Sequence, residues 1–175
     1  MIEGTGEAVA TVEVAAAFAF LADPHNSTRW FAGADLALPP EGPLREGLTW
    51  RLEKTAGTRH VLPMRMTVYE PPARFVWETQ LLPGLATNNV WELRFQAGDE
   101  AGTTRLQMFF RLRLSPAGWL TRVIAPQSLR RTLDTQAQAA VDRAAAALAN
   151  RGRSRKHERR DTPGGKSSAR GRKRR

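Results

Sequence analysis

The stretch that decides the fold is residues 127–150, QSLRRTLDTQAQAAVDRAAAALAN. Its apolar residues recur at steps of three and four, which places them on one stripe of an α-helix. The stripe consists of Leu129, Leu133, Ala137, Ala140, Val141, Ala144 and Leu148. Such a helix is about 36 Å long, enough to cross a small domain. We therefore expect it to cover an apolar face formed by the rest of the chain.

That face is expected on a sheet between residues 47 and 115. Apolar and polar residues alternate in 47–54, 60–70, 74–80, 91–96 and 105–114, with Pro- or Gly-containing turns between them, which predicts an antiparallel meander. Glu78, Glu92 and Tyr69 are expected on the polar face, where arginines favour cross-strand ion pairs. The apolar face is expected to carry Leu48, Trp50, Leu52, His60, Leu62, Met64, Met66, Val68, Phe75, Trp77, Thr79, Trp91, Leu93, Phe95, Leu106, Met108, Phe110, Leu112 and Leu114.

Shorter elements are expected on either side of these strands. Residues 7–14 predict a first strand and residues 15–22 a helix. Asp23 is a suitable N-cap for a second short helix that has Pro24 at its first position and ends near Trp30. Residues 34–38 indicate a short edge strand. Ser115-Pro116 predicts one more helical segment before the long helix.

The charge of the chain is concentrated at its end. Residues 151–175 hold 12 basic and 2 acidic residues, which account for the whole net charge of +10, whereas residues 1–150 are formally neutral. This composition predicts a domain over residues 1–150 and a disordered basic tail over 151–175. The tail suits non-specific nucleic acid or an anionic membrane surface, and a merely solubilising extension is the alternative. The candidate polyanion-binding residues are Arg151, Arg153, Arg155, Lys156, Arg159, Arg160, Arg172, Lys173, Arg174 and Arg175.

Composition argues against several other classes of site. The chain has no cysteine and only three histidines, so we expect no metal site, no disulfide and no cofactor. No apolar run approaches the ~20 residues of a membrane span. The N-terminus lacks the basic and apolar regions of a secretory signal. A soluble, cytoplasmic protein is expected.

The order of these elements, and several short motifs, resemble a known superfamily. VEVAAAFAFLADPHNSTRWF (residues 12–31) resembles the opening of the START-like (helix-grip, SRPBCC) superfamily, particularly its polyketide cyclase/dehydrase-type members. GLTWR (residues 47–51) and VYEPPARFVWE (residues 68–78) resemble its third strand and a characteristic corner. The resemblance covers about residues 5–150 and implies an α+β fold, in which a curved antiparallel sheet of about seven strands grips the last helix. It also implies a cavity that holds lipids, polyketides or other apolar molecules, and in some members a cyclisation or dehydration reaction.

Candidate site residues follow from the apolar face. Its large side chains are candidate walls of a ligand pocket, and a fully packed core is the alternative. These candidates are Trp50, Met64, Met66, Trp77, Trp91 and Phe110. Arg130 lies at nearly the same helical angle as Leu148 and is a candidate for binding a ligand carboxylate, or else reaches to solvent along its stem.

Two functions are therefore open for the domain. The leading hypothesis is non-catalytic binding, with possible transport or sequestration, of a small hydrophobic molecule between the sheet and the last helix. The rival is a cyclase or dehydrase that uses His60, the catalytic candidate of the chain, because imidazole can move protons near neutral pH. An exposed turn position is the structural alternative for His60. The oligomeric state is left open.

Overall fold

The computed structural model describes residues 1–31, 35–38, 42–54, 60–79, 86–114 and 126–160. For residues 36, 54, 60, 86, 87, 126 and 152–160 it describes the backbone alone. The helical segment expected after Ser115-Pro116 and the final residues 161–175 lie outside these ranges.

The strands form one antiparallel sheet of seven, in the order β1-β7-β6-β5-β4-β3-β2. They are β1 (Ile2–Ala10), β2 (Leu36–Leu38), β3 (Thr49–Lys54), β4 (His60–Glu70), β5 (Arg74–Thr79), β6 (Ala86–Ala97) and β7 (Thr104–Leu114). Strands β2 to β7 pair in chain order, which confirms the meander, and β1 pairs with β7 at the far edge.

Two short helices follow β1 and lie against the apolar side of the sheet. They are α1 (Val14–Leu21) and η1 (Pro24–Arg29), a 3₁₀ helix. The predicted cap of η1 is confirmed, because Asp23 Oδ1 accepts a hydrogen bond of 2.9 Å from the backbone N–H of His25, and Pro24 is the first helical residue. The aromatic residues Trp30 and Phe31 directly follow η1 and are buried.

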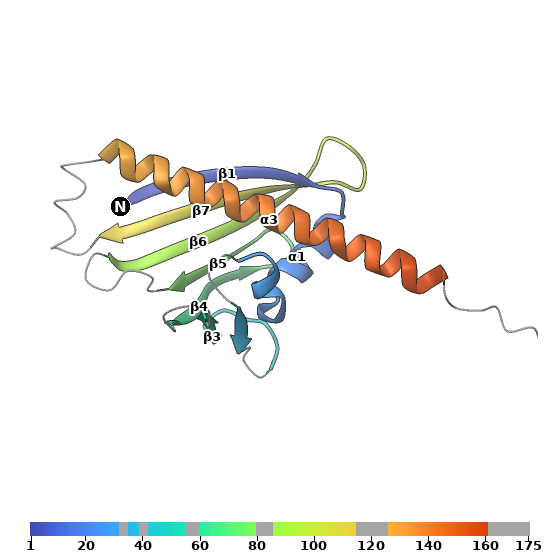
Figure 1. Cartoon of the computed structure of the whole chain (residues 1–175), viewed down its shortest axis with the longest axis horizontal. Coiled ribbons are helices and arrows are strands. Elements are labelled where there is room, and N and C mark those ends of the chain that lie inside the picture. The colour runs from blue at the N-terminus through green and yellow to red at the C-terminus, as the bar shows by residue number, and fades with distance from the viewer. Residues whose placement is uncertain (32–34, 39–41, 55–59, 80–85, 115–125, 161–175) are drawn as a thin grey trace, which may run out of the picture.

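The long helix α3 (Pro126–Arg160) lies across the sheet over β1 and β7 (Figure 1). Its predicted stripe is confirmed, since Leu133, Ala137, Val141 and Leu148 are all buried. The apolar face of the sheet thus meets the apolar stripe of the helix, as the alternation and the helical spacing require. None of the described helices combines the length and apolarity that a bilayer crossing requires.

The helix does not end near Asn150, as its sequence suggested, but continues for ten residues to Arg160. Figure 1 shows this last part projecting beyond the sheet. Arg151, expected in the disordered tail, is half-buried and donates a hydrogen bond of 3.1 Å to the carbonyl oxygen of Ala16. Its guanidinium also lies 5.2 Å from the centre of the Phe20 ring. Arg151 therefore joins α3 to α1, an attachment that a count of charges cannot reveal.

Strand β1 begins at Ile2, not at Glu7. Two of its inward positions are Gly4 and Gly6. Glycine has no apolar side chain, so the alternation of apolar and polar residues could not be recognised in this part of the strand. A Cβ on Gly6 would lie 2.5 Å from the backbone nitrogen of Gln138, and one on Gly4 would overlap the backbone at Leu133. The backbone of α3 therefore rests directly on β1, a distance that only glycine allows.

Side chains of α3 also complete the hydrogen bonding of this edge strand. Asp134 Oδ1 accepts from the N–H of Thr5 at 2.9 Å. Gln138 Oε1 accepts from the N–H of Glu7 at 3.1 Å, and its Nε2 donates to the Glu7 carbonyl at 2.9 Å. An exposed edge strand would otherwise leave these groups free to pair with another chain.

A bulge in β4 corrects one part of the predicted alternation. The register shifts between Met66 and Val68, so Val68 pairs with the outward Val76, and Tyr69 pairs with the inward Phe75. Tyr69 accordingly lies 5.5 Å, between ring centres, from Phe18 of α1. The expected inward Val68 and outward Tyr69 are wrong, because the bulge adds one residue to β4 and reverses the faces beyond it.

Replacing Gly6 by alanine is expected to lower the free energy of unfolding by about 2–3 kcal/mol, because the new methyl group overlaps the backbone of Gln138. Thr5→Ala is the matched control: its side chain is exposed, its N–H still reaches Asp134, and it should stay within about 0.5 kcal/mol of the parent. Urea unfolding of both variants measures the difference. Equal stability of the Gly6→Ala variant and the parent would contradict the close helix–strand contact.

Candidate functional site

The inner face of the sheet presents two neighbouring rows of side chains. In the first row Met66, Trp77, Trp91 and Phe110 follow one another across β4 to β7. In the second, the register runs through Trp50, Met64, Thr79, Asn89 and Leu112 across β3 to β7. Two polar residues thus stand side by side in an otherwise apolar row.

The first row is a stack of aromatic rings. Trp91 and Phe110 lie 3.9 Å apart between ring centres at an interplanar angle of 12°. Trp77 and Trp91 lie 6.5 Å apart at 11°. These rings are nearly parallel and face one another, so the stack forms an apolar wall. Aromatic rings also pack edge-to-face, so a wall of this kind suits an aromatic ligand.

The segment after η1 covers this wall. Trp30 meets Trp77 edge-on, with ring centres 5.4 Å apart and planes at 72°. Phe31 meets Trp91 in the same way, at 5.4 Å and 76°. One hydrogen bond of 3.3 Å, from Nε of Arg143 on α3 to the Trp30 carbonyl, fixes this segment to the long helix.

A cavity of about 10 Å³ remains between this cover and the sheet. It is about the size of a single water. Its lining comes from α1 and η1 (Leu21, Ala22, Ser27, Trp30 and Phe31) and from β3 to β5 (Trp50, Leu52, Met64, Met66, Phe75 and Trp77). Four of the six predicted wall residues therefore line it, and the other two, Trp91 and Phe110, belong to the adjacent stack. The interior bounded by described residues is nearly filled by its own side chains. A larger, open groove lies along β2 to β4, and residues of both faces line it: the inward Trp50 and Met64 together with Leu38, Thr49, Arg51, Pro63 and Arg65.

Several polar atoms in this interior have no hydrogen-bond partner among the described residues. They are the indole Nε1 of Trp30, Trp50, Trp77 and Trp91, the hydroxyl of Thr79, and both amide atoms of Asn89. A buried donor or acceptor left without a partner costs about 1–3 kcal/mol. Native cores contain few such atoms, so a cluster of them requires an explanation.

Sequence reasoning placed Thr79 on the inner face but missed Asn89. The polar residues Thr87, Asn88 and Asn89 interrupt the apolar pattern, so the strand was expected to begin only at Trp91. Strand β6 begins at Ala86, and Asn89 is fully buried. Because side chains two residues apart in a strand share a face, extending the predicted strand two residues before Trp91 would have placed Asn89 on the inner face.

The other candidate residues lie elsewhere. Arg130 is exposed in the first turns of α3, before the buried Leu133, which agrees with the alternative that it reaches to solvent. Its binding of a ligand carboxylate stays a prediction. His60 begins β4 opposite Lys54, and its side chain lies outside the described structure, so its catalytic role stays a prediction. Within the described ranges no group of His, Cys, Asp and Glu is arranged to hold a metal ion.

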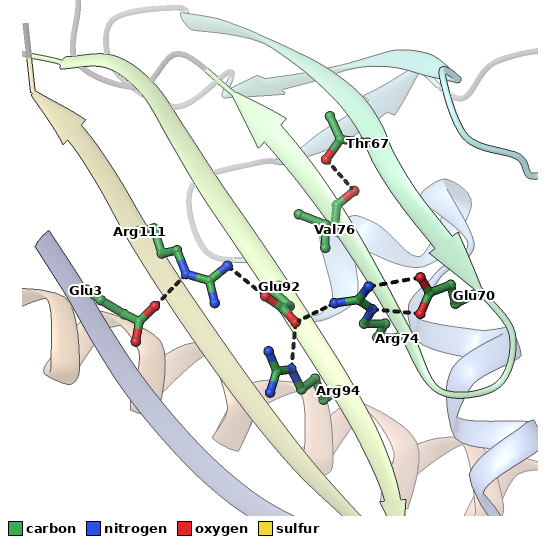
Figure 2. Close-up of polar contacts among 8 residues, drawn as sticks. All are labelled: Glu3, Thr67, Glu70, Arg74, Val76, Glu92, Arg94 and Arg111. Atoms are coloured by element: carbon green, nitrogen blue, oxygen red, sulfur yellow. Dashed lines mark hydrogen bonds and ion pairs between the residues drawn. The ribbon is translucent and has the colours of Figure 1, made fainter. Parts of the chain in front are cut away.

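The outer face of the sheet carries an ion-pair network centred on Glu92 (Figure 2). Although it faces away from the core, Glu92 is only 2% exposed. Its carboxylate accepts hydrogen bonds from Nε of Arg94 at 2.6 Å and from Arg111 at 2.7 Å. Arg74 lies 3.5 Å away. Burial raises the pKa of Glu92, but the hydrogen bonds and charges of Arg94 and Arg111 outweigh it, so the pKa falls below its ordinary value. The cross-strand ion pairs expected on this face are thus present at Glu92.

Comparisons with known proteins support the architecture. A sequence model of the family described as polyketide cyclase/dehydrase and lipid transport matches residues 1–149. No curated protein sequence matches the chain. The di-domain ARO/CYC StfQ from the steffimycin biosynthetic pathway is similar in structure, with a TM-score of 0.66 and 16% identity over 86% of this chain and 51% of that one. This chain therefore spans about half of StfQ.

Single-domain structures are similar as well. XoxI from Bacillus cereus gives a TM-score of 0.65 at 11% identity, over 87% of this chain and 99% of that one. Ara h 8.0201 gives a TM-score of 0.64 at 8% identity, over 85% of this chain and 97% of that one. At these identities the likeness establishes the fold alone. It confirms the expected helix-grip architecture of sheet and C-terminal helix.

Replacing Glu92 by glutamine is expected to lower the free energy of unfolding by about 1–3 kcal/mol at pH 7, because buried charge-assisted hydrogen bonds are lost. A carboxyl whose pKa is lower in the folded state stabilises above its unfolded pKa of about 4.3, and this contribution disappears as the pH falls through the folded value. The difference in the free energy of unfolding between variant and parent should therefore become smaller below about pH 4. Urea unfolding of both proteins from pH 7 to 3 measures this difference.

Asp99→Asn is the control for this series, because the Asp99 side chain is 89% exposed in its pair with Arg105. It should unfold like the parent throughout. If the free energies of unfolding of the Glu92→Gln variant and the parent differ by the same amount from pH 7 to 3, a lowered pKa at Glu92 is contradicted.

Proposed function

Because the chain belongs to the polyketide cyclase/dehydrase and lipid transport family, we propose that it binds a small, flat, mainly apolar molecule that carries oxygen acceptors. The ligand lies against the ring stack of Trp77, Trp91 and Phe110. The observation that carries this proposal is the set of buried indole N–H groups around that stack that have no partner in the described ranges.

The chemistry of indole determines which ligand fits. An indole N–H donates a hydrogen bond and cannot accept one. Trp30, Trp50 and Trp77 border the same small cavity, and Trp91 stacks beside it. A hydrocarbon would leave these donors unpaired, whereas a planar molecule with carbonyl or hydroxyl oxygens would pair them and still pack against the rings.

Room for the ligand must come from the covering segment, since the present cavity holds about one water. Trp30 and Phe31 occupy the space over the stacked rings. They follow a 3₁₀ helix of six residues, and the hydrogen bond from Arg143 of α3 to the Trp30 carbonyl is long, at 3.3 Å. Binding accordingly shifts these two side chains from the wall and opens the interior.

Catalysis by His60 is the alternative function. StfQ bears the designation ARO/CYC, which makes a ring-forming reaction the natural rival. The inward polar groups described at the stack are neutral amide, hydroxyl and indole groups, which suits binding of an uncharged ligand. A His60→Gln variant that binds as tightly as the parent but loses turnover of a cyclisable substrate would establish the rival.

Calorimetric titration with 2-naphthol tests binding at the ring stack. The parent is expected to bind one molecule per chain. Phe110→Leu, which removes one wall of the stack, should weaken binding by about 3–10-fold, the contribution of an aromatic pair. Phe109→Leu is the matched control, because Phe109 directly precedes Phe110 in β7 and lies on the outer face beneath Arg94. Absence of binding by the parent, or equal losses in both variants, would contradict the proposal.

For the basic end of the chain we propose a separate role as a non-specific tether to polyanions such as nucleic acid or anionic membranes. The concentration of the whole net charge in residues 151–175 supports it. So does the course of α3, whose last turns project beyond the sheet and carry basic residues away from the neutral domain (Figure 1). Multiple lysines and arginines bind phosphates with a strong dependence on salt.

Two chain lengths test the tether. A chain that ends at Arg151 keeps the contacts of this residue with α1, so its melting temperature should equal that of the full chain. It should lose binding to a 20-base-pair DNA and to anionic vesicles in fluorescence anisotropy and sedimentation. Binding by the full chain should fall steeply between 50 and 200 mM salt. Undiminished binding by the shortened chain would place the contact on the domain.

A further inference from the structure

We infer that Thr79 and Asn89 form a neutral hydrogen-bonding subsite for an uncharged amide-like or hydroxy-carbonyl group of the ligand. The inference rests on the proposed function, since it assigns one end of the same interior. It adds the position and the charge state of the ligand's polar group, which the ring stack alone does not define.

The two residues are directly opposite each other on neighbouring strands. Thr79 is the last residue of β5, and its Cα partner on β6 is Asn89. Both face inward beside the Trp77–Trp91 pair, because side chains two residues apart in a strand share a face. Thr79 is 3% exposed and Asn89 is not exposed at all. Their side chains therefore lie opposite each other beside the middle of the ring stack.

Neither side chain has a hydrogen-bond partner among the described residues. The hydroxyl of Thr79 and both the oxygen and the nitrogen of the Asn89 amide are unpaired. The neighbours of this pair in the same row are Met64 and Leu112, which offer no strong acceptor or donor. Leucine and valine have nearly the same shapes as asparagine and threonine, so a core designed for stability alone would place them here.

The donors and acceptors of the pair define the complementary group. The Asn89 amide offers an acceptor oxygen and a donor nitrogen, and the Thr79 hydroxyl offers one of each. A group that both accepts and donates, such as a carboxamide or a carbonyl beside a hydroxyl, satisfies them together. A carboxylate is disfavoured, because no described charged side chain shares this row and an unpaired buried charge is costly.

Three naphthalene derivatives of similar size test the subsite by calorimetry. They are 2-naphthamide, which accepts and donates, 2-ethylnaphthalene, which does neither, and 2-naphthoate, which is charged at pH 7. The parent should bind the amide at least tenfold more tightly than the other two. Asn89→Leu and Thr79→Val should each lose most of this preference and keep their affinity for 2-ethylnaphthalene.

The melting temperature of the ligand-free variants separates a binding role from a structural one. Asn89→Leu should melt at or above the temperature of the parent, because it removes unpaired polar atoms. Melting several degrees lower would show that the amide has structural partners and would overturn the subsite. An unchanged preference for the amide in both variants, or tighter binding of naphthoate than of naphthamide by the parent, would also overturn it.

The same titrations distinguish a wrong subsite from a wrong function. Binding of 2-ethylnaphthalene and 2-naphthamide with equal affinity by the parent would overturn the subsite and leave ligand binding at the ring stack intact. Failure of the parent to bind any of the three would overturn the proposed function and the subsite together.

Discussion

The contact between the backbone of α3 and strand β1 is the constraint on which the rest of the structure depends. Gly4 and Gly6 allow the helix to rest on the strand without intervening side chains, and Asp134 and Gln138 then complete the hydrogen bonds of that edge. This fixes the helix over β1 and β7. The remaining inner face of the sheet is covered by α1, η1 and the aromatic residues that follow them. The small alanines of the helix stripe are the counterpart of the two glycines, since both bring the elements close together.

The interior that results combines tight packing with poor polar pairing. Large rings fill the space between η1 and strands β4 to β7, yet their indole N–H groups, Thr79 and Asn89 find no partner within the part of the chain that the structure describes. A core selected only for stability would use apolar residues at these positions. Loss of stability at a cluster of residues, compensated elsewhere, is typical of sites that bind another molecule. The outer face is the opposite case, because Glu92 is also buried but is paired with Arg94 and Arg111.

The sequence predicts most of the architecture, because alternation and helical spacing follow directly from which face is buried. It fails where a residue carries no such signal. Gly4 and Gly6 hid the start of β1, and the polar Asn89 hid the start of β6. The bulge after Met66 reversed the faces of Val68 and Tyr69, which a strict period of two cannot represent. Arg151 was counted with the tail, since its contacts with Ala16 and Phe20 join parts of the chain far apart in sequence. The inward residues of the aromatic wall could be predicted one by one from the alternation. That Trp30 and Phe31 occupy nearly all of the space over this wall could not.

The central claim is that the buried donors of this interior are paired only when a ligand is present. Proton–nitrogen NMR of the tryptophan indoles tests it most directly, because the shift of an indole N–H proton reports its hydrogen bonding. In the free chain, the indole protons of Trp30, Trp50, Trp77 and Trp91 should show the upfield shifts of unbonded N–H groups. On saturation with 2-naphthol, the protons of at least Trp77 and Trp91 should move downfield. Downfield, hydrogen-bonded positions in the free chain that do not change on saturation would contradict it.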